Sequence, residues 1–502
     1  MGKTRSWITP FKKQCFVTVG VSVNMAAHGL LIGFAAILLP QLRKPDSVIP
    51  IDDASGSWIA SILGFALVAG NFIVPTIMAK YGRRTANLAS LAPMLVGWFF
   101  VILATNITTL LIARLLQGLA MGMSASLGPV LIGEYTSPMN RGAFLTFISL
   151  SIATGVLCVH TLGSFLTWQV TALVIACVVF ADLLIVMYSP ESPSWLADQG
   201  RYDECRHVFR WLRGHGEDDE LEKMIEASKM VRDAKAFEKI SDTLAKKLRS
   251  NFGYINTTMR KKEFYKPIFI MIHIYTLGQW AGANVISAYT IDLFKHIIGD
   301  GVNLPLIMIT LDIQRILSNS MAVFVIRKVK RRTMLFATVG INLFAFLSIA
   351  VYTYCKGYNL LPFDHPAIGI ALIHIHMFSI ATGTVPLPFI IAGELFPLEY
   401  RSLAGGISVL FLSFNLFLTV KTAPFLFKTI GVYGAYILYA SVVGYCLIVS
   451  LIFLPETKDR TLQEIEDEFR GRPLSPEELK FTQSLSYLNL YNTDRRFSSP
   501  LI

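Results

Sequence analysis

The chain has 502 residues, of which 53% are hydrophobic and only 16% are charged, and its mean hydropathy is +0.52. A composition this apolar excludes a soluble globular protein and is typical of a chain that crosses a membrane many times. The net charge of +11 fits a membrane protein whose basic loops contact anionic lipid heads. Without a folded basic domain, nucleic acid is not an expected partner.

Twelve apolar stretches are long enough to cross a bilayer as helices, which takes about 20 residues each. They lie at residues 15–40, 57–79, 86–105, 109–132, 143–165, 168–188, 267–295, 303–327, 333–355, 366–393, 402–428 and 433–454. Only helices and closed barrels span membranes, and these stretches are too long for barrel strands. We therefore predict an all-α polytopic membrane protein with twelve transmembrane helices.

A long polar segment divides these helices into two groups of six. The predicted organisation is an N-terminal six-helix bundle (1–189), a cytoplasmic helical linker (190–266), a C-terminal six-helix bundle (267–454) and a cytoplasmic tail (455–502). Lysine and arginine gather in the linker and in the loops after the second and eighth stretches. Because basic residues favour the cytoplasmic side, we predict that both termini and the linker are cytoplasmic.

Three short motifs recur in the same order in both halves. GRRT (82–85) matches KRRT (330–333), GEYTSPMNRG (133–142) matches GELFPLEYRS (393–402), and PESP (190–193) matches PETK (455–458). Ordered repeats of this kind predict a transporter with two pseudo-symmetric bundles and a midplane site between them.

These motifs also carry a resemblance to a known family. With RLLQGLAMG in the fourth stretch, GQWAGAN in the seventh, PLPFIIAGELFP in the tenth and LPETKDRTLQEIEDEF after the twelfth, the chain resembles the sugar porter family of the major facilitator superfamily over nearly its full length. Within it, the insect facilitated trehalose transporter-like members are the most similar group. The resemblance implies two bundles that rock around a sugar site, a multi-pass protein of the plasma membrane, and a transport rather than an enzymatic role, with no cofactor and no metal.

The resemblance further implies a gating network on the cytoplasmic face. Arg83, Arg84 and Arg141 are expected to pair with Glu134 and Glu191, and Arg331, Arg332 and Arg401 with Glu394 and Glu456. Such pairs would bridge the halves when the inner gate closes; the alternative is a static network that anchors loops to lipid heads. The chain departs from the family at Ala79, Arg327 and Lys330, which alters the charge balance of both loops.

The residues at the family's sugar-site positions are Ser149, Gln279, Asn284, Arg315, Phe389 and Ser413. Only Gln279 and Asn284 keep the family's amides, and Gly278 replaces the first glutamine of a pair. Half or more of the usual hexose contacts are changed, so the substrate is expected to be a sugar or related polyol of open identity. Arg315 is either a cavity arginine for a non-hexose ligand or a structural partner of Asp312.

Two helix breaks are predicted from glycine and proline. Pro386 and Pro388 lie inside the tenth stretch, where proline removes backbone hydrogen bonds, and they indicate either a gating hinge or a packing kink. Gln279 and Asn284 are five residues apart, so on a regular helix they diverge by roughly 140°. They can face one cavity only if the helix breaks between them, at Gly282.

The mode of transport is predicted from the lack of an acidic residue at one position of the first apolar stretch. Gly33-Phe34-Ala35 has alanine where proton-coupled members of the family carry an acid, which favours a facilitative uniporter working by alternating access. A nutrient sensor of the same fold that binds but does not transport is the alternative. The short tail favours the carrier, whose partners would be a small-molecule substrate and the lipid bilayer.

Overall fold

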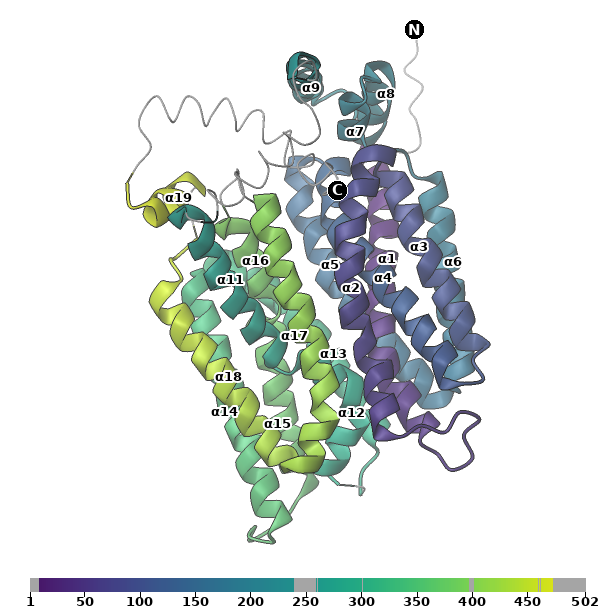
Figure 1. Ribbon diagram of the computed structural model, residues 1–502, viewed down its shortest axis with the longest axis vertical. Helices are drawn as coiled ribbons and strands as arrows, with labels where there is room; N and C mark the ends of the chain where they lie inside the picture. The colour runs from purple at the N-terminus through teal and green to yellow at the C-terminus, as the bar shows by residue number, and fades with distance from the viewer. Residues whose placement is uncertain are drawn as a thin grey trace.

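The computed structural model describes residues 9–238, 259, 261–299, 301–396, 401–458, 460 and 462–472. Within these residues all regular secondary structure is helical, and the helices form two bundles that lie side by side (Figure 1). Eleven helices are long and apolar enough to cross a membrane. The remaining predicted span is divided into α11 (Lys262–Trp280) and α12 (Ala283–Ile297), and this break explains why it is absent from the eleven.

The first bundle contains six long helices. They are α1 (Pro10–Leu42), α2 (Asp53–Tyr81), α3 (Arg83–Ile102), α4 (Ile107–Tyr135), α5 (Pro138–Phe165) and α6 (Trp168–Tyr188). Polar side chains cap several of their N-termini: Asp52 and Asn106, for example, accept hydrogen bonds from the backbone N–H groups of Ser55 and Thr109.

Glycine allows α1 and α5 to approach closely. A Cβ atom at Gly29 would lie 2.0 Å from the carbonyl oxygen of Ile152, and one at Gly155 would lie 2.1 Å from that of Ala26. Small residues are the usual means by which helices pack tightly within a membrane. The two helices therefore form a rigid unit of the first bundle.

The second bundle contains the broken seventh span and five further spans. They are α11 with α12, α13 (Leu304–Lys328), α14 (Arg331–Gly357), α15 (Pro366–Ser379) continued by a π-helix (Ile380–Thr384) and α16 (Pro386–Leu395), α17 (Arg401–Thr429) and α18 (Gly431–Phe453). The twelve predicted spans thus all correspond to observed helices, with ends that differ by a few residues.

The linker forms three helices at one end of the bundles. They are α7 (Pro193–Asp198), α8 (Tyr202–Arg213) and α9 (Asp218–Glu238), and residues 239–258 of the predicted linker lie outside the described residues. The side chain of Gln14 on α1 donates to the carbonyl oxygen of Leu212 at 3.2 Å, which fixes α8 to the first bundle. We call this end the linker face and the opposite end the far face; α19 (Leu462–Arg470) also lies on the linker face (Figure 1).

Candidate functional site: a cavity between the two bundles

Polar contacts join the two bundles near the far face. Arg43 at the end of α1 makes an ion pair with Asp292 of α12, with 2.6 Å between Nη1 and Oδ2. Lys421 of α17 donates to Ser57 Oγ of α2 at 2.7 Å, and its ammonium lies 4.0 Å from the ring centroid of Trp58. These contacts hold the bundles together on this side.

Close helix packing continues the closure toward the centre of the molecule. A Cβ atom at Gly64 of α2 would lie 2.4 Å from Leu416 Cδ2 and 2.8 Å from the backbone nitrogen of Phe417, both on α17. Glycine is therefore required for α2 and α17 to touch here. The two helices are therefore in direct contact at this level.

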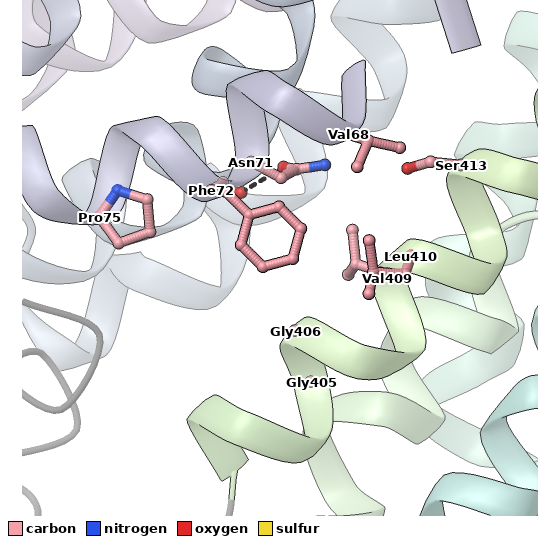
Figure 2. Close-up of a pocket in the computed structure, with 10 residues that line it drawn as sticks. Val68, Asn71, Phe72, Pro75, Gly405, Gly406, Val409, Leu410 and Ser413 are labelled. Carbon is pink, nitrogen blue, oxygen red and sulfur yellow. Dashed lines mark hydrogen bonds between the residues drawn. The ribbon is translucent and has the colours of Figure 1, made fainter. Parts of the chain in front are cut away.

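On the linker-face side of that contact, the two bundles leave a cavity of about 210 Å³. Its walls are mostly apolar and come from both halves (Figure 2). The lining residues are Val68, Asn71, Phe72, Pro75 and Ser126 from the first bundle, and Gly405, Gly406, Val409, Leu410 and Ser413 from α17. The cavity thus lies at the boundary between the halves.

Two polar atoms of this cavity lack protein partners. Ser126 Oγ donates to Asn71 Oδ1 at 2.7 Å, which orients the amide, while Asn71 Nδ2 is buried without a hydrogen bond. Ser413 Oγ, on the opposite wall, is also buried without one. Figure 2 shows the two groups pointing toward each other across the cavity. Buried polar groups without partners are costly, so this pair is suited to a ligand that supplies hydroxyl groups.

Of the six predicted sugar-site residues, only Ser413 lines this cavity. Gln279 and Asn284 instead bind each other, with 2.6 Å between Asn284 Nδ2 and Gln279 Oε1. The predicted break between them is present: Gly282 has φ +97°, in the left-handed region that favours glycine. The break brings the two amides together, as expected, but at a place outside the cavity walls.

The other three predicted residues do not reach the cavity. Ser149 is exposed and donates to the carbonyl oxygen of Thr146 at 3.2 Å. Phe389 is also exposed, and its ring centroid lies 5.9 Å from that of Tyr275. Arg315 donates to Ser287 Oγ on α12 at 3.3 Å.

Arg315 and Asp312 interact electrostatically, but no direct ion pair joins them in the described structure. Although the two residues lie one turn apart on α13, the Asp312 carboxylate contacts His160 Nδ1 on α5 at 2.5 Å. Arg315 is directed to α12 instead. Tertiary packing against two different helices therefore separates side chains that are neighbours along the helix.

The structure explains why glycine stands at position 278. A Cβ atom there would lie 3.0 Å from the carbonyl oxygen of Thr384 and 3.3 Å from Pro388 Cγ. The backbone of α11 packs directly on the interrupted tenth span, so the glutamine of the family pattern has no space here.

The predicted interruption of the tenth span is present as a π-helix. The N–H of Val385 donates to the carbonyl oxygen of Ile380 at 3.2 Å, five residues earlier, and α16 begins at Pro386. Because Pro386 and Pro388 have no N–H, the regular α-helical pattern cannot continue through them. Their role as a hinge stays a prediction.

The charged motifs form a network within the first bundle. The guanidinium of Arg83 pairs with Glu134 at 2.9 Å, and the Glu191 carboxylate accepts from the backbone N–H groups of Arg83 and Arg84 at 2.8 and 3.1 Å. Arg84 also donates to the carbonyl oxygen of Met187. Glu191 therefore caps the N-terminus of α3, where the helix dipole favours a negative charge.

An equivalent network forms in the second bundle. Arg331 pairs with Glu394 at 2.9 Å, and Glu456 accepts from the backbone N–H groups of Arg331 and Arg332 at 2.9 and 3.1 Å. Thr457 Oγ1 donates to Glu394 at 2.6 Å. The internal repeat seen in the sequence thus corresponds to a repeated arrangement of side chains.

The expected pairs Arg83–Glu134 and Arg331–Glu394 are present, while bridging between the halves was expected for a closed inner gate and stays a prediction. Both ion pairs join helices of the same half, because Arg83 and Arg331 begin α3 and α14 while Glu134 and Glu394 lie at the ends of α4 and α16. Arg141 Nε is buried without a hydrogen bond, and the side chain of Arg401 lies outside the described residues. A gating role for the charged residues stays a prediction.

Known proteins resemble this chain both in sequence and in fold. The family described as sugar (and other) transporter matches residues 10–469. The chain belongs to this family. One relative of this sugar transporter is facilitated trehalose transporter Tret1 of Apis mellifera ligustica, which is 26% identical over 92% of this chain and 90% of the relative. Another is solute carrier family 2, facilitated glucose transporter member 8, of Mus musculus, which is 26% identical over 92% of this chain and 96% of the relative. The predicted resemblance to sugar porters, and to the insect trehalose group, is confirmed.

Solved structures show the same fold. The inward open conformation of the xylose transporter XylE from E. coli superposes with a TM-score of 0.70 at 16% identity, covering 90% of this chain and 99% of that one. XylE bound to 6-bromo-6-deoxy-D-glucose gives a TM-score of 0.67, also at 16% identity, over 92% and 99%. The predicted two-bundle fold of the major facilitator superfamily is therefore confirmed.

Sequence reasoning missed the contribution of the first bundle to the cavity. Asn71 and Ser126 belong to no motif that the sequence pointed to. A signal was nevertheless present, since Asn71 is the only amide side chain in α2, and a polar group inside a membrane span commonly faces a cavity or a neighbouring helix.

Proposed function

We propose that this sugar transporter is a facilitative uniporter that carries a sugar or related polyhydroxy compound by alternating access. The observation that carries the proposal is the cavity between the bundles, lined from both halves and lying toward the linker face while contacts such as Arg43–Asp292 close the far face. A carrier of this type needs one site that contacts both halves and a seal on one side of it.

The orientation is part of the same proposal. The linker face carries most of the basic side chains of the loops, so it is cytoplasmic, as are both termini. The structure then represents an inward-facing state of a plasma-membrane carrier. Relatives named as trehalose and glucose transporters support a sugar as the substrate.

We further assign substrate recognition to Asn71 and Ser413. Asn71 Nδ2 is a donor, and Ser413 Oγ both donates and accepts, so together they bind one hydroxyl from opposite sides. The apolar wall that contains Phe72 is suited to the CH groups of a sugar ring. A ligand held by both halves responds to any change in their separation.

The test is counterflow of radiolabelled trehalose and glucose in proteoliposomes that contain the purified chain. We expect exchange without ATP and without a pH gradient. Asn71→Leu and Ser413→Ala should each raise KM about tenfold, because each removes one buried hydrogen-bond partner. Ser441→Ala is the matched control, since its hydroxyl is exposed on α18 and bonds only to the carbonyl oxygen of Ile437.

Two results would contradict the proposal. Sugar binding without any counterflow would indicate the sensor function instead. Unchanged KM values in both cavity variants would exclude the assigned recognition site, while leaving transport itself intact.

A further inference from the structure

A buried titratable pair connects the two bundles at a place that the proposed transport function does not use. His160 Nδ1 of α5 lies 2.5 Å from Asp312 Oδ2 of α13, and the two side chains are only 2% and 4% exposed. His160 is five residues from the end of α5 and Asp312 eight residues from the start of α13, about 8 and 12 Å from the far ends of their helices. The pair therefore lies in the part of the molecule that closes the far face.

The surroundings of His160 leave no other partner for its ring. Its Nε2 is buried without a hydrogen bond, and a Cβ atom at Gly33 of α1 would lie only 3.0 Å from it. The ring edge thus rests on the α1 backbone, while Nδ1 is directed across the boundary between the bundles. Any charge on the imidazole is balanced chiefly by Asp312.

Other ionisable side chains lie inside the bundles on the helices packed against α5, or close to the pair, among the described residues. They are His28 of α1, Arg114 of α4, Asp182 of α6 and Arg315 of α13. Arg114 donates to the carbonyl oxygens of Leu31 and Ile59 and to Gln117, and Arg315 donates to Ser287. No hydrogen bond or ion pair joins any of these four side chains to His160 or Asp312 in the described part of the chain.

Charge balance decides which form of the pair is buried. With a neutral imidazole the pair carries one negative charge, which Arg315 attracts only through space because its guanidinium donates to Ser287. A buried carboxylate without a charged group in contact is costly. With an imidazolium the pair is neutral overall and forms a charge-assisted hydrogen bond. When the bundles part at the far face, this contact is broken, and histidine is the side chain that changes its charge most readily between about pH 5 and pH 8.

We propose that His160 and Asp312 form a proton-dependent latch, in which closure of the far face traps a proton between the bundles and reopening releases it. This latch rests on the proposed alternating-access function and its orientation. Acid outside the cell then stabilises the inward-facing state and slows the return of the empty carrier.

The latch regulates transport without driving it. Neither His160 nor Asp312 lines the cavity that lies toward the linker face, and both are buried in this state. The proton therefore leaves on the side from which it came. A pH gradient changes the rate of exchange but does not concentrate the substrate.

The experiment uses a cysteine reporter that is independent of any substrate. In a full-length chain with its six cysteines replaced by serine, Ser57→Cys is buried at the far-face closure and reacts with a membrane-impermeant methanethiosulfonate only when that face opens. Val48→Cys, whose parent side chain is 73% exposed near the far face, corrects for titration of the thiol itself. We expect the corrected rate on intact cells to be about fivefold lower at pH 6 than at pH 8.

Matched variants identify the group that titrates. His160→Asn keeps a donor near the position of Nδ1 but cannot titrate, so its corrected rate should be independent of pH. Asp312→Asn should lose the response as well, while His273→Asn should keep it, because His273 is only partly buried and bonds within its own helix to the carbonyl oxygen of Phe269. Labelling of Val48→Cys in each background verifies that the variant reaches the surface.

Three outcomes would overturn the latch: a pH response retained by His160→Asn, a response of opposite sign in the parent chain, or accumulation of labelled trehalose driven by a pH gradient. Labelling of Val48→Cys in inverted vesicles but not on intact cells would instead refute the proposed orientation. The same reporters in inverted vesicles then test the latch from the other side.

Discussion

The Arg43–Asp292 ion pair is the far-face contact whose loss we expect to open that face most strongly. Its side chains are 26% and 29% exposed, and its atoms are 2.6 Å apart. Asp53, by contrast, is 64% exposed and lies 3.8 Å from Lys428 and 3.9 Å from Arg43. A short and partly buried charged hydrogen bond contributes about 1.5 kcal/mol, whereas an exposed ion pair contributes roughly 0.5 kcal/mol.

These magnitudes separate two otherwise similar substitutions. A difference of 1.4 kcal/mol corresponds to a factor of ten in an equilibrium. Asp292→Asn should therefore raise the ratio of far-open to far-closed carrier about tenfold, and Asp53→Asn about twofold. The rate at which the Ser57→Cys reporter reacts with the impermeant reagent measures this ratio while the far-closed state predominates.

A double-mutant cycle tests whether the effect belongs to the pair. Arg43→Gln alone should resemble Asp292→Asn, and the two together should open the face little more than either one, because the same contact is lost. Fully additive effects would refute the reasoning. So would an effect of Asp53→Asn as large as that of Asp292→Asn, since burial would then not decide the strength of the contacts.

Three further changes probe the fold. Gly282→Ala should lower the free energy of unfolding by about 1–2 kcal/mol, because the backbone of Gly282 is left-handed. Gly444→Ala should not, because an added Cβ atom there meets nothing within 4 Å; thermal unfolding in detergent measures both variants. Glu134→Gln should destabilise the protein more than Glu394→Gln, since these carboxylates are 12% and 28% exposed, and equal melting temperatures would contradict this. Burial raises the pKa of Cys205 to about 12, so maleimide should label this thiol at pH 8 only after the linker unfolds; rapid labelling of the native protein would show that the linker core is open.

The charged motifs show how far the repeated sequence could be followed. The family resemblance implied that Arg83 would meet Glu134 and that Arg331 would meet Glu394, and each of these pairs joins the ends of neighbouring helices in one bundle. Whether such pairs also cross between bundles depends on the angle between the two halves. That angle is set by the packing of the whole molecule, so it cannot be predicted from the spacing of residues within a motif.

The sugar site shows the opposite case. The family pattern predicted six sugar-site residues. The cavity is lined by only one of them, Ser413, together with the polar residues Asn71 and Ser126, which the pattern did not predict. Hydropathy says that a side chain is polar within a span; it does not say which way the span is turned about its axis. Rotation is set by contacts such as Gly64 against Phe417, which bring together residues hundreds of positions apart.

By itself the sequence determined the membrane environment, the helical spans, the two related halves and the breaks at Gly282 and Pro386. These follow from local physics: the length of apolar runs, and the backbone freedom or restriction of single residues. Only the tertiary structure decided which face is closed, which polar groups remain without partners in the cavity, and that His160 meets Asp312. Those outcomes depend on how separate helices pack, because hydrogen bonds between helices form only where packing brings their side chains within reach.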